Sequence, residues 1–296
     1  MPWRLGGSPG LPTAAQVQER AGWIEQAGLD SIWSLDTLAP QVQLRADPLT
    51  WLLTCALATR QIEVGTAVYV ISNRNPVDVS QRLLTLEALV PGRFSLGVGA
   101  GSTKSADDAL GTIFDDRFRN LYKNMDVIRR LCRGEHVGDA FLNPPPGTGG
   151  PRFYLGAWAS PISLKHAINE FDGWQISGGR TAAGVGTASF KHMREGLQRY
   201  RSMGGTKRAM VSTVSVDLDA EGGPLGDEDH FNLNCPPAEA ARRVKVLADQ
   251  GWDDLLLNPR ADITPDDLKR IRDLTPKDTR PLSPQFPSPS GRSGRG

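Results

Sequence analysis

The chain has 296 residues, a length that allows one large domain or two medium ones. Its 34 Lys and Arg residues nearly balance 33 Asp and Glu residues, so no strong field of one sign attracts nucleic acid or an anionic membrane surface. No apolar run reaches the roughly 18 residues of a membrane span, and the first residues lack a secretory signal. We therefore expect a cytoplasmic protein without nucleic-acid or membrane partners.

Cysteine and histidine usage excludes two further classes of protein. Cys55, Cys132 and Cys235 lie far apart in the sequence, which argues against a disulfide framework and against a thiolate metal cage. The four histidines share no metal-ligand spacing, so the sequence predicts no metal site.

Strand-like and helical segments alternate along the chain. Thr13 and Gln16 form a capping box before the first helix. Four more helices begin at pairs of a capping residue and proline, namely Asp47-Pro48, Asn75-Pro76, Ser160-Pro161 and Thr264-Pro265. Helices without such a pair are expected over residues 117–131, 189–201 and 238–250. The predicted strands cover residues 3–5, 30–35, 62–70, 94–98, 153–155, 173–177, 210–218 and 254–257.

This order predicts a (β/α)8 TIM barrel with a short first strand, formed by residues 1–274 as one domain. An open, doubly wound sheet is the alternative, but such sheets rarely contain this many units without a domain break. Residues 99–116 and 134–150 are expected to be loops. Residues 275–296 are rich in Pro, Ser, Gly and Arg, which predicts a disordered tail.

In a parallel barrel, functional side chains lie where the strands end, because the following loops share one face. Asp36 follows the strand at 30–35, where a carboxylate serves either as an acid/base group or as a cap of the next loop. Gly97, Gly99 and Gly101 depart from the dinucleotide fingerprint, because Ser102 occupies its third position. These glycines either let a flat ligand approach the backbone or form a turn.

Two other strand ends carry candidate binding residues. Gly178-Gly179-Arg180 combines exposed backbone N–H groups with a guanidinium, which suits phosphate oxygens, although a surface turn with a solvated arginine is equally compatible. Trp158 lies just after the strand at 153–155, whereas most of the other tryptophans are expected to pack in the core.

Several segments occur together in a distinctive order and spacing. They are residues 28–33 with Asp36, Asp47-Pro48, residues 58–66, Asn75-Pro76, residues 84–101 and Asp172-Gly173-Trp174. Jointly they resemble the bacterial luciferase-like superfamily of flavin- and deazaflavin-dependent oxidoreductases. The resemblance extends over residues 12–180.

The resemblance implies a TIM barrel, usually dimeric, that holds the deazaflavin coenzyme F420 or reduced FMN at its top. A chain of this length without large insertions is more similar to the deazaflavin-using branch. In that branch a non-prolyl cis peptide supports the ring, and Ala67-Val68 occupies the matching position. The remaining implied cofactor-binding residues are Gly99, Gly101, Gly156, Ala157, Trp158, Ser177, Gly178, Gly179 and Arg180.

Two positions depart from the pattern of this family. Thr37 stands where many relatives have His, and Ser102 stands where the sugar-phosphate dehydrogenases have Glu. Asp36 and Ser102 are therefore the candidate catalytic residues, and no substrate class carries over. The main hypothesis is hydride transfer to or from a small organic substrate. An FMNH2-dependent monooxygenase is the enzymatic alternative, and a catalytically degenerate flavin-binding barrel is the alternative from another class.

Overall fold

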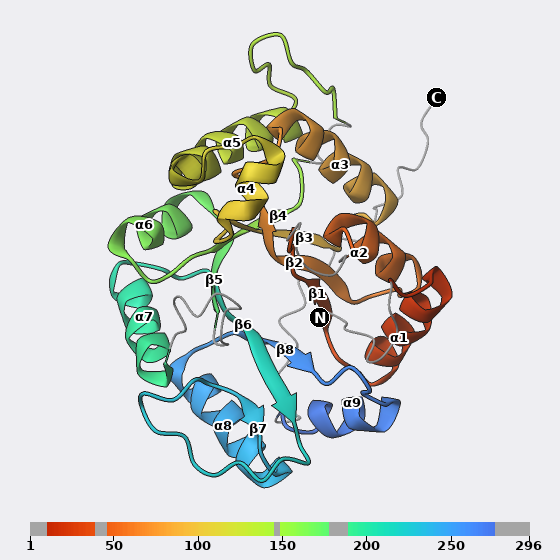
Figure 1. Cartoon of the computed structure of the whole chain (residues 1–296), viewed down its shortest axis with the longest axis vertical. Helices are drawn as coiled ribbons and strands as arrows, with labels where there is room; N and C mark the ends of the chain where they lie inside the picture. Colours follow the sequence, from red (N-terminus) through yellow and green to blue (C-terminus); the bar gives the residue numbers. More distant parts are fainter. Residues whose placement is uncertain (1–10, 39–45, 145–148, 178–188, 276–296) are drawn as a thin grey trace, which may run out of the picture.

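The computed structural model describes residues 11–38, 46–144, 149–177 and 189–275, in which helices surround a parallel sheet (Figure 1). The strands are β1 (Ser31–Ser34), β2 (Glu63–Val70), β3 (Phe94–Gly99), β4 (Arg152–Gly156), β5 (Gly173–Ser177), β6 (Arg208–Asp217), β7 (Leu233–Asn234) and β8 (Asp254–Pro259). The α-helices are α1 (Ala14–Gln26), α2 (Pro48–Leu57), α3 (Pro76–Leu89), α4 (Lys104–Leu110), α5 (Arg117–Cys132), α6 (Pro161–Glu170), α7 (Phe190–Ser202), α8 (Pro237–Gln250) and α9 (Pro265–Arg272).

The predicted capping residues begin their helices as expected. Thr13 and Gln16 form the capping box of α1, with the Thr13 N–H donating to Gln16 Oε1 at 2.9 Å. Asp47 caps α2 by accepting a hydrogen bond from the Thr50 N–H at 2.8 Å. Asn75, Ser160 and Thr264 cap α3, α6 and α9 in the same manner, each followed by proline.

The sheet confirms the predicted barrel architecture. Every strand pair is parallel, and the order runs from β1 to β7, with β8 beside β6. Among the described residues β1 pairs with β2, β8 pairs with β6, and no pairing joins β1 to β8. A cavity of about 520 Å³ lies beside β1 and β8. The strand predicted at residues 3–5 lies outside the described residues, and so does the predicted tail beyond Thr275.

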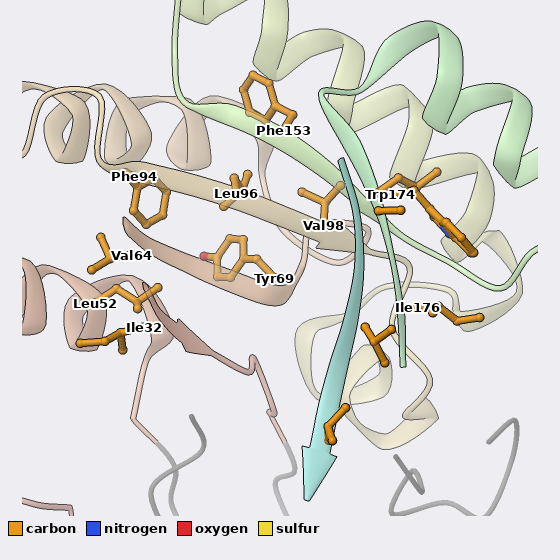
Figure 2. Close-up of a cluster of buried hydrophobic side chains, with 14 of the residues drawn as sticks. Ile32, Leu52, Val64, Tyr69, Phe94, Leu96, Val98, Phe153, Trp174 and Ile176 are labelled. Atoms are coloured by element: carbon orange, nitrogen blue, oxygen red, sulfur yellow. The ribbon is translucent and has the colours of Figure 1, made fainter. Parts of the chain in front are cut away.

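One cluster of apolar side chains fills the space between the sheet and the helices (Figure 2). Val64, Phe94 and Leu96 contribute to it from β2 and β3, and each is at most 1% exposed. Trp174 and Ile176 extend it along β5. Since these strands send alternate residues into this layer, the intervening residues face the inside of the barrel.

A second apolar cluster, formed by Trp33, Tyr154, Met210 and Leu256, fills the inside of the barrel. The rings of Trp33 and Tyr154 meet edge to face with 6.0 Å between centroids. The barrel interior is therefore packed with side chains from strands that lie far apart in the sequence.

Charged side chains meet at the amino-terminal ends of the strands. Glu63, which is 6% exposed, accepts hydrogen bonds from Arg208 at 2.8 Å and from Arg152 at 3.2 Å. Burial acts to lower the pKa of Arg208, but its hydrogen bond to Asp254 and the charges of Asp254 and Glu63 raise it. This network joins β2, β4, β6 and β8 at the end of the barrel away from the candidate site.

Two features differ from the sequence-based expectation. Residues 99–116 were expected to be a loop, but they contain α4 and a 3-10 turn at Phe114–Asp116. The pair Lys104–Asp108, spaced i to i+4 with 2.7 Å between charged atoms, supports this short helix, and Gly111 ends it in the left-handed conformation. The sequence analysis also did not predict β7, because a strand of two residues is too short to show an alternation of apolar and polar side chains.

Candidate functional site

An irregular segment marks the carboxyl end of β2. Thr66 pairs with Leu96 and Tyr69 pairs with Val98, so Ala67 and Val68 together oppose Gly97 on β3. Thr66 and Tyr69 are buried, whereas Ala67 and Val68 are partly exposed. This bulge turns two consecutive side chains toward the inside of the barrel. The Ala67-Val68 peptide bond is cis, which confirms the position implied by the family resemblance.

Glycines on the two neighbouring strands make room for the Val68 side chain. A Cβ atom on Gly99 would lie 2.6 Å from Val68 Cγ2, and one on Gly156 would lie 2.2 Å from Val68 Cγ1. Both distances are too short for any side chain. The structure therefore brings three of the predicted cofactor-binding residues together, and Gly99 and Gly156 act by seating Val68.

Asp36 lies beside this segment and is held from three directions. Its backbone N–H donates to Val68 O at 3.0 Å, and its carboxylate Oδ2 accepts from the Val70 N–H at 3.0 Å. Arg74 Nη2 lies 2.9 Å from Oδ2 and 3.1 Å from Oδ1. The side chains of Asp36 and Arg74 are 5% and 24% exposed. Asp36 therefore ties the end of β1 to the end of β2 across Val68.

The chain after β2 is fixed by three further hydrogen bonds and one cation–π contact. The Ser72 hydroxyl donates to Ala100 O at 2.8 Å, and the Asn124 amide donates to Ile71 O at 2.8 Å and to Arg74 O at 3.1 Å. The Arg74 guanidinium also lies over the ring of Tyr69, 4.4 Å from its centroid. These contacts join the end of β2 to β3 and α5.

The loop between β4 and α6 is held by its own backbone. The Ala157 N–H donates to Gln175 O at 3.1 Å, and Ala157 O accepts from Trp174 Nε1 at 2.9 Å. Both polar backbone groups of Ala157 are thus engaged within the protein. Trp158, which follows, exposes 42% of its surface. In this loop the indole ring of Trp158 is accessible to a ligand, whereas the backbone N–H and C=O of Ala157 are already hydrogen-bonded within the protein.

The remaining predicted residues have different surroundings. Ser102 is exposed just before α4, and no described contact joins it to Val68 or Asp36. Gly101 adopts a positive φ of 76°, and a Cβ there would lie 2.8 Å from Val70 Cγ1. Ser177 ends β5 and is partly exposed. Gly178, Gly179 and Arg180 lie outside the described residues.

Burial affects several reactive side chains. It raises the pKa of the Cys55 and Cys132 thiols to about 12, which favours the protonated thiol over the reactive thiolate at neutral pH. Burial likewise raises the pKa of Tyr69 to about 12. Tyr69 therefore contributes packing and a ring beneath Arg74 rather than a titrating hydroxyl.

Two residues of this region were missed by the sequence analysis. Arg74 precedes the Asn75-Pro76 pair, and nothing in the sequence around an arginine before a helix cap indicates that it pairs with Asp36. Gln175 is 1% exposed, and neither atom of its amide has a hydrogen-bond partner among the described residues. A Cβ on Gly97 would lie 2.1 Å from Gln175 Nε2, so Gly97 is needed to seat that amide.

Comparison with known proteins identifies the family of this chain. A family model described as luciferase-like monooxygenase matches residues 1–222. The chain belongs to the luciferase-like monooxygenase family. The match confirms the resemblance inferred from the sequence and the expectation of a luciferase-like oxidoreductase barrel.

Two related sequences represent different chemistries. A 4-hydroxyprotoasukamycin monooxygenase from Streptomyces nodosus subsp. asukaensis is 35% identical over 131 residues, which is 44% of this chain and 35% of the relative. An F420-dependent glucose-6-phosphate dehydrogenase from Kineococcus radiotolerans is 28% identical over 241 residues, which is 76% of this chain and 70% of the relative. The chain thus spans about a third of the first relative and over two thirds of the second.

Solved structures show the same fold at lower identity. An F420-dependent secondary alcohol dehydrogenase, in complex with an F420-acetone adduct, aligns with a TM-score of 0.72 and 16% identity over 89% of this chain and 94% of that one. The oxygenating constituent of 3,6-diketocamphane monooxygenase from Pseudomonas putida, in complex with FMN, aligns with a TM-score of 0.67 and 16% identity. This alignment covers 89% of this chain and 93% of that one. Both likenesses establish the barrel fold.

Proposed function

We propose that this protein is an oxidoreductase that uses the deazaflavin coenzyme F420 for hydride transfer to or from a small organic substrate. The observation that carries the proposal is the Val68 bulge seated on Gly99 and Gly156 at the carboxyl ends of three adjacent strands. The F420-dependent glucose-6-phosphate dehydrogenases among its relatives support the choice of coenzyme.

The residues at this end of the barrel fit a flat ring system. Ala67, Val68, Gly99 and Gly156 are small residues on neighbouring strands, and Gly101 follows β3. The Val68 side chain occupies the space that a Cβ atom on Gly99 or Gly156 would need. A ring bound there would lie against an apolar side chain rather than against peptide groups. When bound, the deazaflavin supplies the carbon centre that exchanges the hydride, and the barrel contributes orientation and exclusion of water.

We assign separate roles to the other candidates. Val68 and Ala67 support the ring, Trp158 and Ser177 border it, and Ser102 offers a hydroxyl for proton transfer. Asp36 is our second candidate for proton transfer, but its contacts with Arg74 and Val70 favour a positioning role. We further propose that Gly178, Gly179 and Arg180 hold the phosphate of the cofactor, as the family resemblance implies.

A reduced-FMN monooxygenase is the second candidate function. It is favoured by the 35% identity to 4-hydroxyprotoasukamycin monooxygenase, although the match covers only part of that relative. Fluorescence titration of the protein with F420 and with FMN separates the two, because the functional proposal requires tighter binding of F420. Binding of a cofactor without turnover of any substrate would instead support the degenerate barrel.

We also propose an organisation for the whole chain. The described elements from α1 to α9 belong to one sheet and its surrounding helices, which supports a single domain over residues 1–274. The Pro, Ser, Gly and Arg content of residues 275–296 is our reason for proposing a tail without a catalytic role there. The family resemblance supports a homodimer, which light scattering would test. None of the described helices has the length and apolar character needed to cross a membrane. We propose a cytoplasmic location.

A further inference from the structure

A second bulge lies in β6 and matches the one in β2. Val211 pairs with Leu255 and Val214 pairs with Leu257, so Ser212 and Thr213 together oppose Leu256 on β8. Leu256 belongs to the apolar cluster inside the barrel. The same two-against-one arrangement therefore occurs twice, once at Ala67-Val68 toward the carboxyl end of β2 and once at Ser212-Thr213 within β6, where Ser212 pairs with Ser177 at the end of β5.

The flanking residues determine which way this second bulge faces. Val211 and Val214 are 0% exposed and pack in the layer between the sheet and the helices. With both valines directed outward, the two residues between them are directed to the inside of the barrel. Ser212 is 5% exposed, and its hydroxyl donates to Ile176 O at 3.3 Å. Thr213, the next residue along β6, is partly exposed.

The backbone conformation of Thr213 is unusual for its residue type. Its φ is 65°, in the left-handed region where a β-branched side chain is strained. Asn143 is the other non-glycine residue with a positive φ in the described ranges, and Asn tolerates this region well. At other positions with a positive φ, such as Gly101 after β3 and Gly251 at the end of α8, the chain uses glycine. The threonine side chain is thus retained at a position where glycine would relieve strain.

The Thr213 hydroxyl is available for a ligand. No hydrogen bond joins its Oγ1 to another residue in the described ranges, whereas the hydroxyls of Ser212 and Thr66 are both engaged with backbone carbonyls. β6 is four strands along from β2 in a sheet that curves into a ring (Figure 1). The Thr213 bulge and the Val68 bulge therefore lie on facing walls of the barrel.

We propose that Thr213 is a cofactor-binding residue whose hydroxyl forms a hydrogen bond with a ring oxygen or nitrogen of the bound deazaflavin. The inference rests on the proposed function, because it takes Val68 as the apolar support of the same ring. Val68 supplies a surface without polar atoms, whereas Thr213 supplies one neutral donor and acceptor on the opposite wall. The strained backbone at Thr213 then holds that hydroxyl at the edge of the ring.

Three substitutions test this role by fluorescence titration with F420 and by thermal unfolding without cofactor. Thr213→Val keeps the β-branched shape and removes the hydroxyl, so we expect about fivefold to tenfold weaker binding of F420 and little change in Tm. Thr213→Gly removes the hydroxyl and the strain, so we expect a Tm higher by about 2–4 °C together with weaker binding. Thr213→Ser keeps the hydroxyl and should bind F420 within about twofold of the wild type.

Asn143→Gly is the matched control, because it changes a second positive-φ residue in the connection that leads to the amino-terminal end of β4. It should leave F420 binding unchanged. Wild-type affinity in both Thr213→Val and Thr213→Gly would overturn the inference while the proposed function stands. If the wild-type protein itself binds neither F420 nor FMN, the proposed function is wrong and the role of Thr213 is rejected with it.

Discussion

Arg74 and Asp36 form an ion pair that joins the chain after β2 to the chain after β1, with 2.9 Å between Nη2 and Oδ2. The same carboxylate oxygen accepts the Val70 N–H, and the Asp36 N–H donates to Val68 O. The pair therefore fixes the backbone on both sides of Val68. Since Val68 is the proposed support of the cofactor ring, we propose that Arg74 is a positioning residue for the site.

Arg74→Gln should weaken binding of F420 and lower stability. The substitution leaves the buried Asp36 carboxylate without its cationic partner, and we expect a loss of about 1.5–3 kcal/mol in the free energy of unfolding. Urea unfolding measures this loss, and hydrogen exchange at the Asp36 and Val70 amides reports whether the backbone around Val68 loosens. Arg82→Gln is the control, because its i to i+4 pair with Asp78 is exposed and should contribute little. Equal effects of the two substitutions would contradict the positioning role.

Asp36→Asn distinguishes a positioning role from proton transfer. The amide oxygen still accepts the Val70 N–H but cannot titrate, so turnover should persist with an unaltered pH profile if Asp36 only positions the backbone. A fall in turnover of about 10²-fold or more with retained cofactor affinity would instead identify Asp36 as the acid/base group. Ser102→Ala, measured in parallel, tests the other candidate for proton transfer.

Gly156→Ala should disturb the site through Val68 rather than through direct contact with the cofactor. The new Cβ would lie 2.2 Å from Val68 Cγ1, so the Val68 side chain must move and F420 binding should weaken severalfold. The double variant Gly156→Ala with Val68→Ala removes the clash and should regain stability relative to Gly156→Ala. Gly22→Ala in α1 is a control, because its Cβ meets nothing closer than 3.8 Å and alanine favours the helix.

The side chain of Glu87 predicts a pH dependence of stability. Burial raises the pKa of Glu87 above its ordinary value of 4.5. A hydrogen bond from the Gly92 N–H to Oε1, at 2.6 Å, acts to lower the pKa but does not cancel the effect of burial. Its Oε2 is buried without a partner among the described residues. The folded state binds the Glu87 proton more tightly than the unfolded state does. The resulting contribution to the free energy of unfolding is therefore fully present below pH 4.5, and it is lost as the pH rises through the raised pKa of the folded state.

Glu87→Gln should remove that dependence. Urea unfolding at a series of pH values from about 4 to 7 would give a flatter stability curve for Glu87→Gln than for the wild type. Glu221→Gln, at an exposed position, serves as the control and should follow the wild-type curve. A variant curve parallel to that of the wild type would show that Glu87 does not titrate in this range.

Local sequence signals predicted the elements well but not the details of the site. At three helix starts the capping side chain accepts a hydrogen bond from a backbone N–H no more than three residues further on, as at Thr13, Asp47 and Asn75. Because these contacts are local, the sequence alone locates those helix starts. By contrast, the partner of Asp36 is Arg74, 38 residues away, and a pairing at that separation is decided by the fold. Nothing in the sequence indicated the bulge at Ser212-Thr213 either, because threonine does not favour a positive φ and the flanking Val211 and Val214 are typical strand residues.

The comparison of F420 with FMN tests the central claim most directly. Purified protein is titrated with each cofactor under the same conditions, and binding is followed by the change in fluorescence of the cofactor. The proposed function predicts saturable binding of F420 with a Kd at least about tenfold lower than that for FMN. Tighter binding of FMN, or no binding of either cofactor, would contradict it.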